Sequence, residues 1–221
     1  MILVSIDTST KYASIGITNL EQSYFYNWQS QYNHGVELTR NLRTLLSKIQ
    51  ADASDITHLA VALGPGGFSS VRVGISTALG LATPNNLPII GVPTHDIQLE
   101  PFRKKINNNT NITSIISAGR NEVSWKKYSI NEITSGITTI QQILENSGAN
   151  DMFCGEYFNE KNIVDLPKKS ILLEKIVRDP KTFNNLAKNM FIDGSYKEYN
   201  EIKPIYSREP TISSPKRKKG L

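Results

Sequence analysis

The sequence has almost no cysteine and no long apolar run. One of its 221 residues is cysteine, Cys154, so a disulfide within the chain and a thiolate metal cluster are both excluded. No hydrophobic stretch approaches the roughly 18 residues needed to span a bilayer. The first residues, MILVSIDTST, lack the positive region of a signal peptide and enter a strand pattern at once. We therefore expect a cytoplasmic protein that makes no membrane contact.

Positive charge is concentrated near the C-terminus. The formal net charge is +5, and much of the excess lies in the last residues, SSPKRKKG. A solvated, basic tail is the simpler interpretation, and a weak, salt-sensitive contact with nucleic acid remains open. Four charges cannot specify a nucleic-acid sequence.

Apolar runs divide the chain into two halves, each with a strand meander followed by helices and strands in alternation. In the first half we expect strands at 2–7, 12–18, 23–28, 59–63 and 87–92, and helices at 35–49 and 69–82. In the second half we expect strands at 112–117, 122–130 and 151–155, a helix at 138–145, and a last helix opened by Asp179 and Pro180.

This pattern favours a two-lobed α/β fold. We assign residues 1–104 to an N-terminal lobe, 105–205 to a C-terminal lobe whose last helix packs back on the first lobe, and 206–221 to a basic tail. The polar stretch RKKINNNTN is the best candidate for a hinge between the lobes.

Residues 62–74, ALGPGGFSSVRVG, could be a phosphate loop or a bend that leads into a helix. A Walker loop needs a lysine after the last glycine, and no lysine occurs between Lys48 and Lys104. The G-x-G-x-x-G spacing of dinucleotide sites is also absent. The sequence therefore favours a structural loop, in which a serine, Ser69 or Ser70, caps the helix. The loop residues are Gly64, Pro65, Gly66 and Gly67.

The helix that follows carries two adjacent stripes. The first contains small residues and the second larger apolar ones, so we expect one stripe to face the protein and the other to face outward. Arg72 is the one charge in this segment, and it needs an anionic or carbonyl partner near a packed surface. The small stripe is Ser70, Gly74, Ala78 and Ala82, and the apolar stripe is Val71, Ile75 and Leu79.

Several segments together resemble the TsaB (YeaZ) family, in the family's order and spacing. They are ILVSIDTSTKYASIGI, NHGVELTRNL, LAVALGPGGFSSVRVGISTALGLA, IIGVPT, NEVSWKKY and KPIYSRE. The glycine block is the specific element, although it reads GPGGFSSVR where the family usually has GPGSFTGLR. Tyr206 and Arg208 match the family's tail.

The resemblance implies an α/β, two-lobed fold of the actin-like, sugar-kinase and Hsp70 type, with mixed sheets flanked by helices. It also implies a non-catalytic partner of TsaD, the paralogue that transfers threonylcarbamoyl to the adenosine beside the anticodon of ANN-decoding tRNAs. TsaE joins this complex, tRNA is contacted indirectly or weakly, and pairing of the chain with itself remains open. The expected partner-binding residues are Leu38, Leu42, Leu45, Leu46, Phe68, Ser69, Ser70, Val71, Arg72, Gly74, Ile75 and Ala78.

The same resemblance suggests that catalytic groups are missing. The catalytic paralogue has H-x-x-x-H after the strand that matches IIGV, whereas this chain has His95 followed by Leu99. We therefore expect no metal, and His95 at the surface or as a cap. Ser117 stands where an aspartate usually opens the hairpin of the second lobe.

The nucleotide site also looks incomplete. Asp7, Thr8, Ser9 and Thr10 occupy the position of the first phosphate loop of actin-like ATPases, and we interpret them as a vestige. Asp7→Ala should then leave folding intact. We expect no cofactor of the chain's own, while a nucleotide shared at the complex interface remains open.

Two enzymatic functions are the alternatives. An autonomous actin-like ATPase or phosphotransferase would use Asp7 to orient metal and Thr8 to Thr10 to contact phosphate. A protease would need a metal or an activated nucleophile, and the sequence has neither HExxH nor GxSxG.

Overall fold

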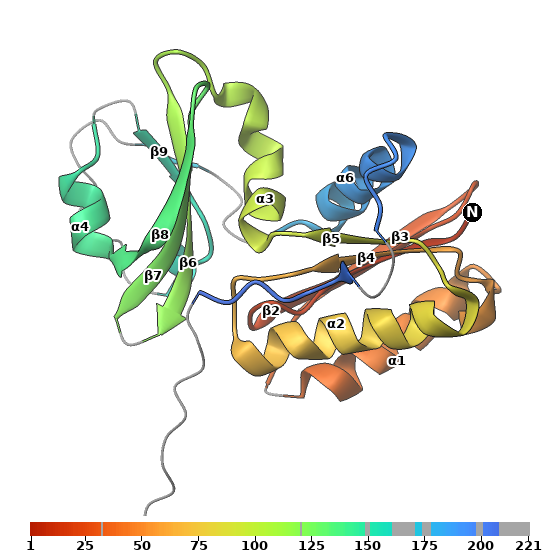
Figure 1. Cartoon of the computed structure of the whole chain (residues 1–221). Helices are drawn as coiled ribbons and strands as arrows, with labels where there is room; N and C mark the ends of the chain where they lie inside the picture. Colours follow the sequence, from red (N-terminus) through yellow and green to blue (C-terminus); the bar gives the residue numbers. More distant parts are fainter. Residues whose placement is uncertain are drawn as a thin grey trace, which may run out of the picture.

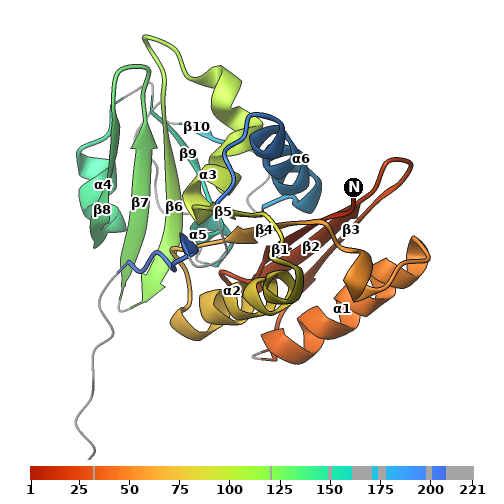
Figure 2. The same cartoon turned by 45° about the vertical axis from the view of Figure 1, so that its right-hand side comes forward.

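The computed structural model describes residues 1–31, 33–119, 121–148, 151–160, 171–173, 178–197 and 201–207. Two five-stranded sheets lie beside each other, each with its own covering helices (Figures 1 and 2). Each sheet is the centre of one lobe.

The first sheet has the strand order β3-β2-β1-β4-β5. Strands β1 to β3 are antiparallel neighbours, whereas β4 and β5 run parallel to β1. Helices α1 and α2 cover one face of this sheet and α6 covers the other (Figure 1). The strands are β1 Leu3–Asp7, β2 Tyr12–Thr18, β3 Ser23–Gln29, β4 His58–Ala62 and β5 Ile89–Val92; the helices are α1 His34–Lys48, α2 Phe68–Ala82 and α6 Pro180–Ile192.

The second sheet repeats this topology with the order β10-β9-β6-β7-β8. Strands β6 to β8 are antiparallel, and β9 and β10 are parallel to β6. This duplication of one mixed sheet is the two-lobed actin-like fold. Its strands are β6 Asn111–Gly119, β7 Glu122–Tyr128, β8 Ile133–Thr139, β9 Asp151–Cys154 and β10 Ile171–Leu172, and its helices are α3 Thr94–Leu99, α4 Ile140–Glu145 and α5 Tyr157–Glu160; short 3-10 turns span Ala53–Asp55, Thr83–Asn85 and Glu100–Lys105.

Burial follows the layers. All residues of β1 are buried because helices cover both faces of the sheet there, whereas the edge strand β3 is largely exposed. Apolar side chains of α1 and α2 meet β1, β2 and β4 in the largest core cluster. Removing such side chains from water is the main source of folding stability, at about 25 cal/mol per Å² of apolar area.

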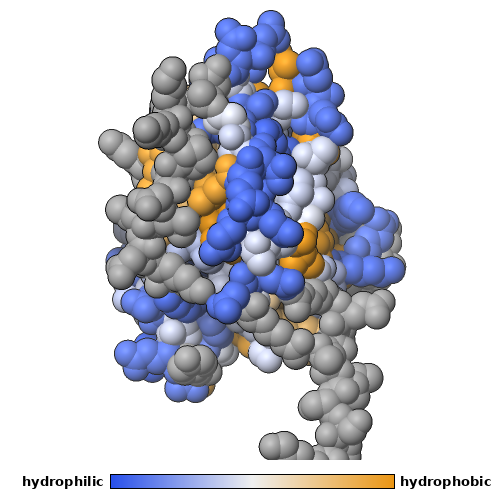
Figure 3. Space-filling view, turned by 90° about the vertical axis from the view of Figure 1, so that its left-hand side faces the viewer, coloured by the Kyte–Doolittle hydropathy of each residue, from blue (hydrophilic) through white to orange (hydrophobic). Residues whose placement is uncertain are grey.

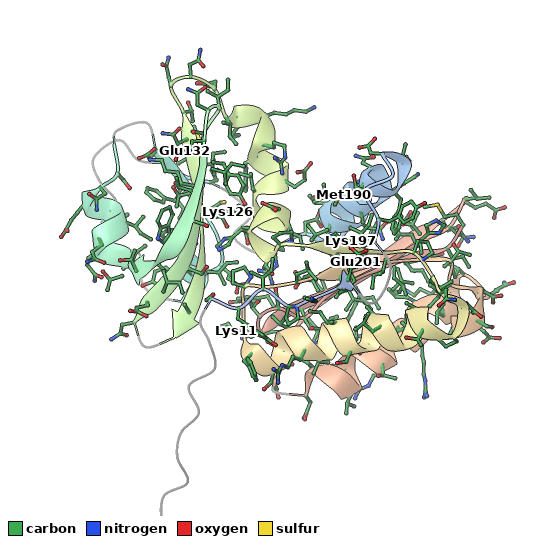
Figure 4. All side chains as sticks on the ribbon, in the orientation of Figure 1. Lys11, Lys126, Glu132, Met190, Lys197 and Glu201 are labelled. Atoms are coloured by element: carbon green, nitrogen blue, oxygen red, sulfur yellow. The ribbon has the colours of Figure 1, made fainter. Side chains whose placement is uncertain are left out.

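Three segments join the lobes. Helix α3 contributes Ile97 to a core cluster of the first lobe and Leu99 to a core cluster of the second. Helix α6 returns to the first sheet, where Phe183 packs with residues of β1, β4 and β5. The C-terminal segment runs along the first lobe, where the Ile205 amide donates to the Leu63 carbonyl at 2.7 Å. Lys197 pairs with Ile89 at the start of β5 and lies beside the first sheet in Figure 4.

Some local predictions were wrong. Strand β8 occupies residues for which we had predicted the start of a helix, and that helix begins only at Ile140. The stretch RKKINNNTN does not lie between the lobes. It forms the end of a 3-10 turn and the tight turn before β6 (Figure 1). Helix α3, which precedes it in the chain, already packs against β6, so the chain has entered the second lobe before this stretch begins.

Candidate functional site

The turn after β1 is the first candidate site, because it holds the residues interpreted as a vestigial phosphate loop. The carboxylate oxygen Oδ1 of Asp7 accepts hydrogen bonds from the Ser9 amide at 2.9 Å and the Ser9 hydroxyl at 2.6 Å. The Thr8 hydroxyl donates to the Ser70 carbonyl at 2.7 Å. Asp7, Thr8 and Ser9 are each at most 1% exposed. Their polar groups are therefore used within the protein.

The glycine block closes directly over this turn. The Gly67 amide and the Ser70 hydroxyl both donate to the Ser9 carbonyl, at 2.8 and 3.2 Å. A Cβ atom on Gly66 would lie 1.9 Å from that same oxygen, so only glycine fits there. The expected serine cap was wrong: Gly67 is the N-cap residue, and Ser70 donates to backbone carbonyls instead. A phosphate would have to displace this packing.

The small-residue stripe of α2 also faces inward. A Cβ atom on Gly74 would lie 2.5 Å from the Thr8 hydroxyl and 3.6 Å from the Ile6 side chain. Gly74 is thus needed for the close approach of α2 to β1, and it is buried in the lobe.

A buried ion cluster joins the same turn to the second lobe. The Arg178 guanidinium donates from Nε to Asp7 Oδ2 at 2.5 Å and from a terminal nitrogen to Glu156 Oε2 at 3.0 Å. Its other terminal nitrogen donates to the Thr10 hydroxyl and the Tyr12 carbonyl, at 3.0 and 3.2 Å. Burial raises the pKa of the Glu156 carboxyl, and the Arg178 charge acts against that rise. Sequence reasoning missed both Arg178 and Glu156.

The actin-like fold implies a magnesium nucleotide between the lobes, and these residues do not fit one. Asp7 has one carboxylate oxygen on Ser9 and the other on Arg178. The structure changes the prediction for Asp7→Ala. That change would leave the Ser9 amide and hydroxyl without their acceptor and Arg178 with Glu156 as its remaining carboxylate, so we now expect it to lower stability.

His95 is buried, not at the surface or a cap as expected. Its ring nitrogens lie 2.9 Å from the Ser114 hydroxyl and 3.0 Å from the Ser124 hydroxyl, and the residue is 3% exposed. Burial lowers the pKa of His95 to about 3, with Lys126 lowering it further and Asp96 raising it. Leu99 lies in the core of the second lobe, so no second imidazole is near.

A cavity of about 420 Å³ opens beside this histidine, between the second sheet and the C-terminal segment. Its walls include Trp125 and Tyr206, and none of the described residues that line it carries a carboxylate. The one lysine of the lining, Lys126, donates to Asp96 of α3 at 2.8 Å and lies between β7 and α3 in Figure 4. These residues do not form a set that could activate water or transfer phosphate.

The face formed by α1 and α2 is the second candidate site. Most residues expected to bind a partner there lie instead in the core of the first lobe. The apolar side of a surface helix normally packs against the protein's own core, and these residues do so here. The buried ones are Leu38, Leu42, Leu45, Leu46, Val71, Ile75 and Ala78, together with Ser70 and Gly74.

Three of the expected residues, Phe68, Ser69 and Arg72, do lie at the surface, at the start of α2. The Arg72 guanidinium carbon lies 3.7 Å from the centre of the Phe68 ring, and its Nε donates to the Tyr206 hydroxyl at 2.7 Å. Among the described residues, Arg72 has no carboxylate partner. On α1, Val36 is 63% exposed.

Other features add no site. Within the described ranges, no helix is both long and apolar enough to cross a bilayer, and no three acidic, histidine or cysteine side chains gather to hold a metal. The outer side of the second lobe shows hydrophilic residues interleaved with small hydrophobic areas (Figure 3). Tail residues Lys216, Arg217, Lys218 and Lys219, and also Arg208, lie outside the described residues.

Comparison with known proteins identifies the family of the chain. The sequence model of the family TsaD, tRNA N6-adenosine threonylcarbamoyltransferase, matches residues 29–152, more than half of the chain. The chain belongs to this family, as one of its TsaB (YeaZ) members.

The curated TsaB proteins that match are named as tRNA threonylcarbamoyladenosine biosynthesis proteins. The one from Escherichia coli is 31% identical over 132 residues, which cover 60% of this chain and 57% of that protein. The one from Haemophilus influenzae is 25% identical over 93% of each chain. Among solved structures, YeaZ from Pseudomonas aeruginosa has a TM-score of 0.74 at 20% identity and covers 93% of this chain and 99% of that one, so it shows the same fold.

Proposed function

We propose that this TsaB-family chain is a non-catalytic subunit that pairs with TsaD in the synthesis of threonylcarbamoyladenosine in tRNA. The observation that carries the proposal is the family membership, with relatives named for this biosynthesis and a family model named for the transferase. TsaE joining the complex, weak or indirect contact with tRNA and a cytoplasmic location belong to the same proposal.

The non-catalytic role is supported by the chemistry of the cleft. Asp7 and Glu156, the acidic groups that could orient a metal or water, are both bound to Arg178. His95 is held neutral between two serine hydroxyls, and no carboxylate among the described residues is bonded to its ring nitrogens. A general base needs a pKa near the working pH and reach to a substrate, and His95 has a pKa of about 3.

The partner surface that we propose differs from the one expected at first. It is the exposed side of α1 and α2, with Val36 on α1 and the Phe68–Arg72 pair at the start of α2. Aromatic residues and arginine are the side chains most enriched at the energetic centres of interfaces. Tyr206 of the C-terminal segment holds this pair in place, with ring centres 5.0 Å apart between Phe68 and Tyr206.

Binding to TsaD from the same organism tests the proposal. Val36→Glu and Phe68→Glu should each weaken the one-to-one complex more than about tenfold, because an interface would bury the new carboxylate without a partner. Ile192→Glu is the matched control. Ile192 is 73% exposed and ends α6, which covers the opposite face of the same sheet. The Ile192→Glu variant should therefore bind TsaD with the affinity of the wild type.

Two results would count against the proposal. If the wild-type proteins stayed separate on gel filtration at micromolar concentration, the pairing itself would be wrong. If all three variants paired equally well, pairing would stand and the proposed surface would be wrong. Thermal unfolding of each variant shows whether a loss of binding follows from a loss of folding.

A further inference from the structure

The cleft between the lobes holds a charged side chain of the protein itself. Arg178 precedes α6, a helix that packs on the first sheet, and its guanidinium lies between Asp7 at the end of β1 and Glu156 after β9. The side chains of all three residues are at most 2% exposed. A cation is therefore built into the point where the two sheets meet.

Both carboxylates are satisfied by this arrangement. Asp7 Oδ2 accepts from Arg178 at 2.5 Å, and Glu156 Oε2 accepts from Arg178 at 3.0 Å and from the Thr10 hydroxyl at 2.9 Å. The guanidinium makes four hydrogen bonds, to both acids, the Thr10 hydroxyl and the Tyr12 carbonyl. Arginine suits this role because its planar fork keeps its charge and can bond several acceptors at once.

The geometry also links parts of the chain that are far apart. Arg178 and Asp7 are separated by 171 residues, and Thr10 and Glu156 by 146. Glu156 belongs to the second lobe and accepts hydrogen bonds from Thr10 and Arg178. These two bonds therefore connect the second lobe to the first. Removal of Arg178 would leave two buried carboxylates without a cation between them.

We infer that Arg178 permanently occupies the interlobe cleft, closing it to a magnesium nucleotide and fastening the two lobes where a ligand would otherwise hold them. This inference concerns the isolated chain and does not depend on pairing with TsaD.

The test is the distance between the lobes, measured by double electron–electron resonance. Spin labels placed by Ser47→Cys on α1 and Glu145→Cys on α4 report it, since both positions are exposed and the native Cys154 is buried. The labelled parent protein should give one narrow distance distribution, unchanged by millimolar magnesium ATP. Adding Arg178→Gln should broaden the distribution and speed cleavage by a protease several-fold. Ile192→Glu, also added to the labelled parent, is the control and should change neither.

Two results would overturn the inference. One is saturable binding of magnesium ATP to the wild type, measured by calorimetry and abolished by Asp7→Asn. The other is a distribution for Arg178→Gln as narrow as that of the labelled parent. If Arg178→Gln does not fold, Asp7→Asn and Glu156→Gln are added to it, so that no carboxylate is left unpaired. The same broadening in that variant supports the inference, and a narrow distribution refutes it.

Discussion

Acid should destabilise this protein through His95 in particular. The imidazole is 3% exposed and lies between the hydroxyls of Ser114 and Ser124. Burial lowers the pKa of His95 from 6.5 to about 3; the nearby charges of Lys126 and Arg178 lower it too, and Asp96 raises it. Folding therefore requires the neutral ring over the whole range in which the unfolded chain would protonate it.

The sign and size of the effect follow from linkage. Between pH 6.5 and about 3 the unfolded chain binds one more proton at His95 than the folded chain, so stability rises with pH in that window. The contribution is complete above the unfolded pKa and is lost as the pH falls toward the folded one. At about 1.36 kcal/mol per pH unit, roughly 2.7 kcal/mol is lost by about pH 4.5.

The assay is denaturant unfolding followed by tryptophan fluorescence, at about pH 7.5 and about pH 4.5. His95→Gln is the comparison, because glutamine keeps a donor and an acceptor for the two serines but binds no proton. Protonation of carboxylates affects both proteins alike. The wild type should therefore lose about 2–3 kcal/mol more than the variant on acidification. Equal losses would refute the reasoning about His95.

Two glycine substitutions test the packing before and within α2, and a thiol reaction tests the core of the second lobe. Gly66→Ala should prevent or strongly impair folding because its Cβ would collide with the Ser9 carbonyl, whereas Gly80→Ala, with nothing within 4 Å, should raise stability by about 0.5–1 kcal/mol in a melting experiment. Burial raises the pKa of the Cys154 thiol to about 12, so Ellman's reagent should react with the denatured protein and not with the folded one. Normal melting of Gly66→Ala, no gain in stability for Gly80→Ala, or a fast reaction of the folded thiol would each contradict the corresponding expectation.

The long helices were predictable because their signal is local. Leu38, Leu42, Leu45 and Leu46 recur at helical spacing, and the structure buries all four on one face of α1. Strand β8, ITSGITT, offered no such signal, since threonine, serine and glycine alternate there with few apolar residues. What fixes it is tertiary: β8 pairs along its whole length with β7, where Gly136 lies opposite Trp125.

The ion cluster could not be read from the sequence at all. Asp7 and Thr10 were singled out by their resemblance to the first phosphate loop of actin-like ATPases, but their partners come from residues 156 and 178. Arg178 also stands just before Asp179 and Pro180, a pair that already explains the local sequence as a helix start; in the structure the Asp179 side chain accepts from the Thr182 amide. Nothing local distinguishes a buried arginine from a solvated one, because the difference lies in which acids the fold brings to it.

The sequence also did not predict which sides of α2 face the lobe, and this orientation bears on function. Two stripes were visible in the sequence, yet both the small one with Gly74 and the larger one with Val71 and Ile75 point into the lobe. The apolar residues available to a partner are then few, and the exposed side of α2 depends on Phe68 and Arg72 being held by Tyr206 from the other end of the chain. A partner that binds there therefore recognises the assembled fold, because no single helix of this protein carries the surface alone.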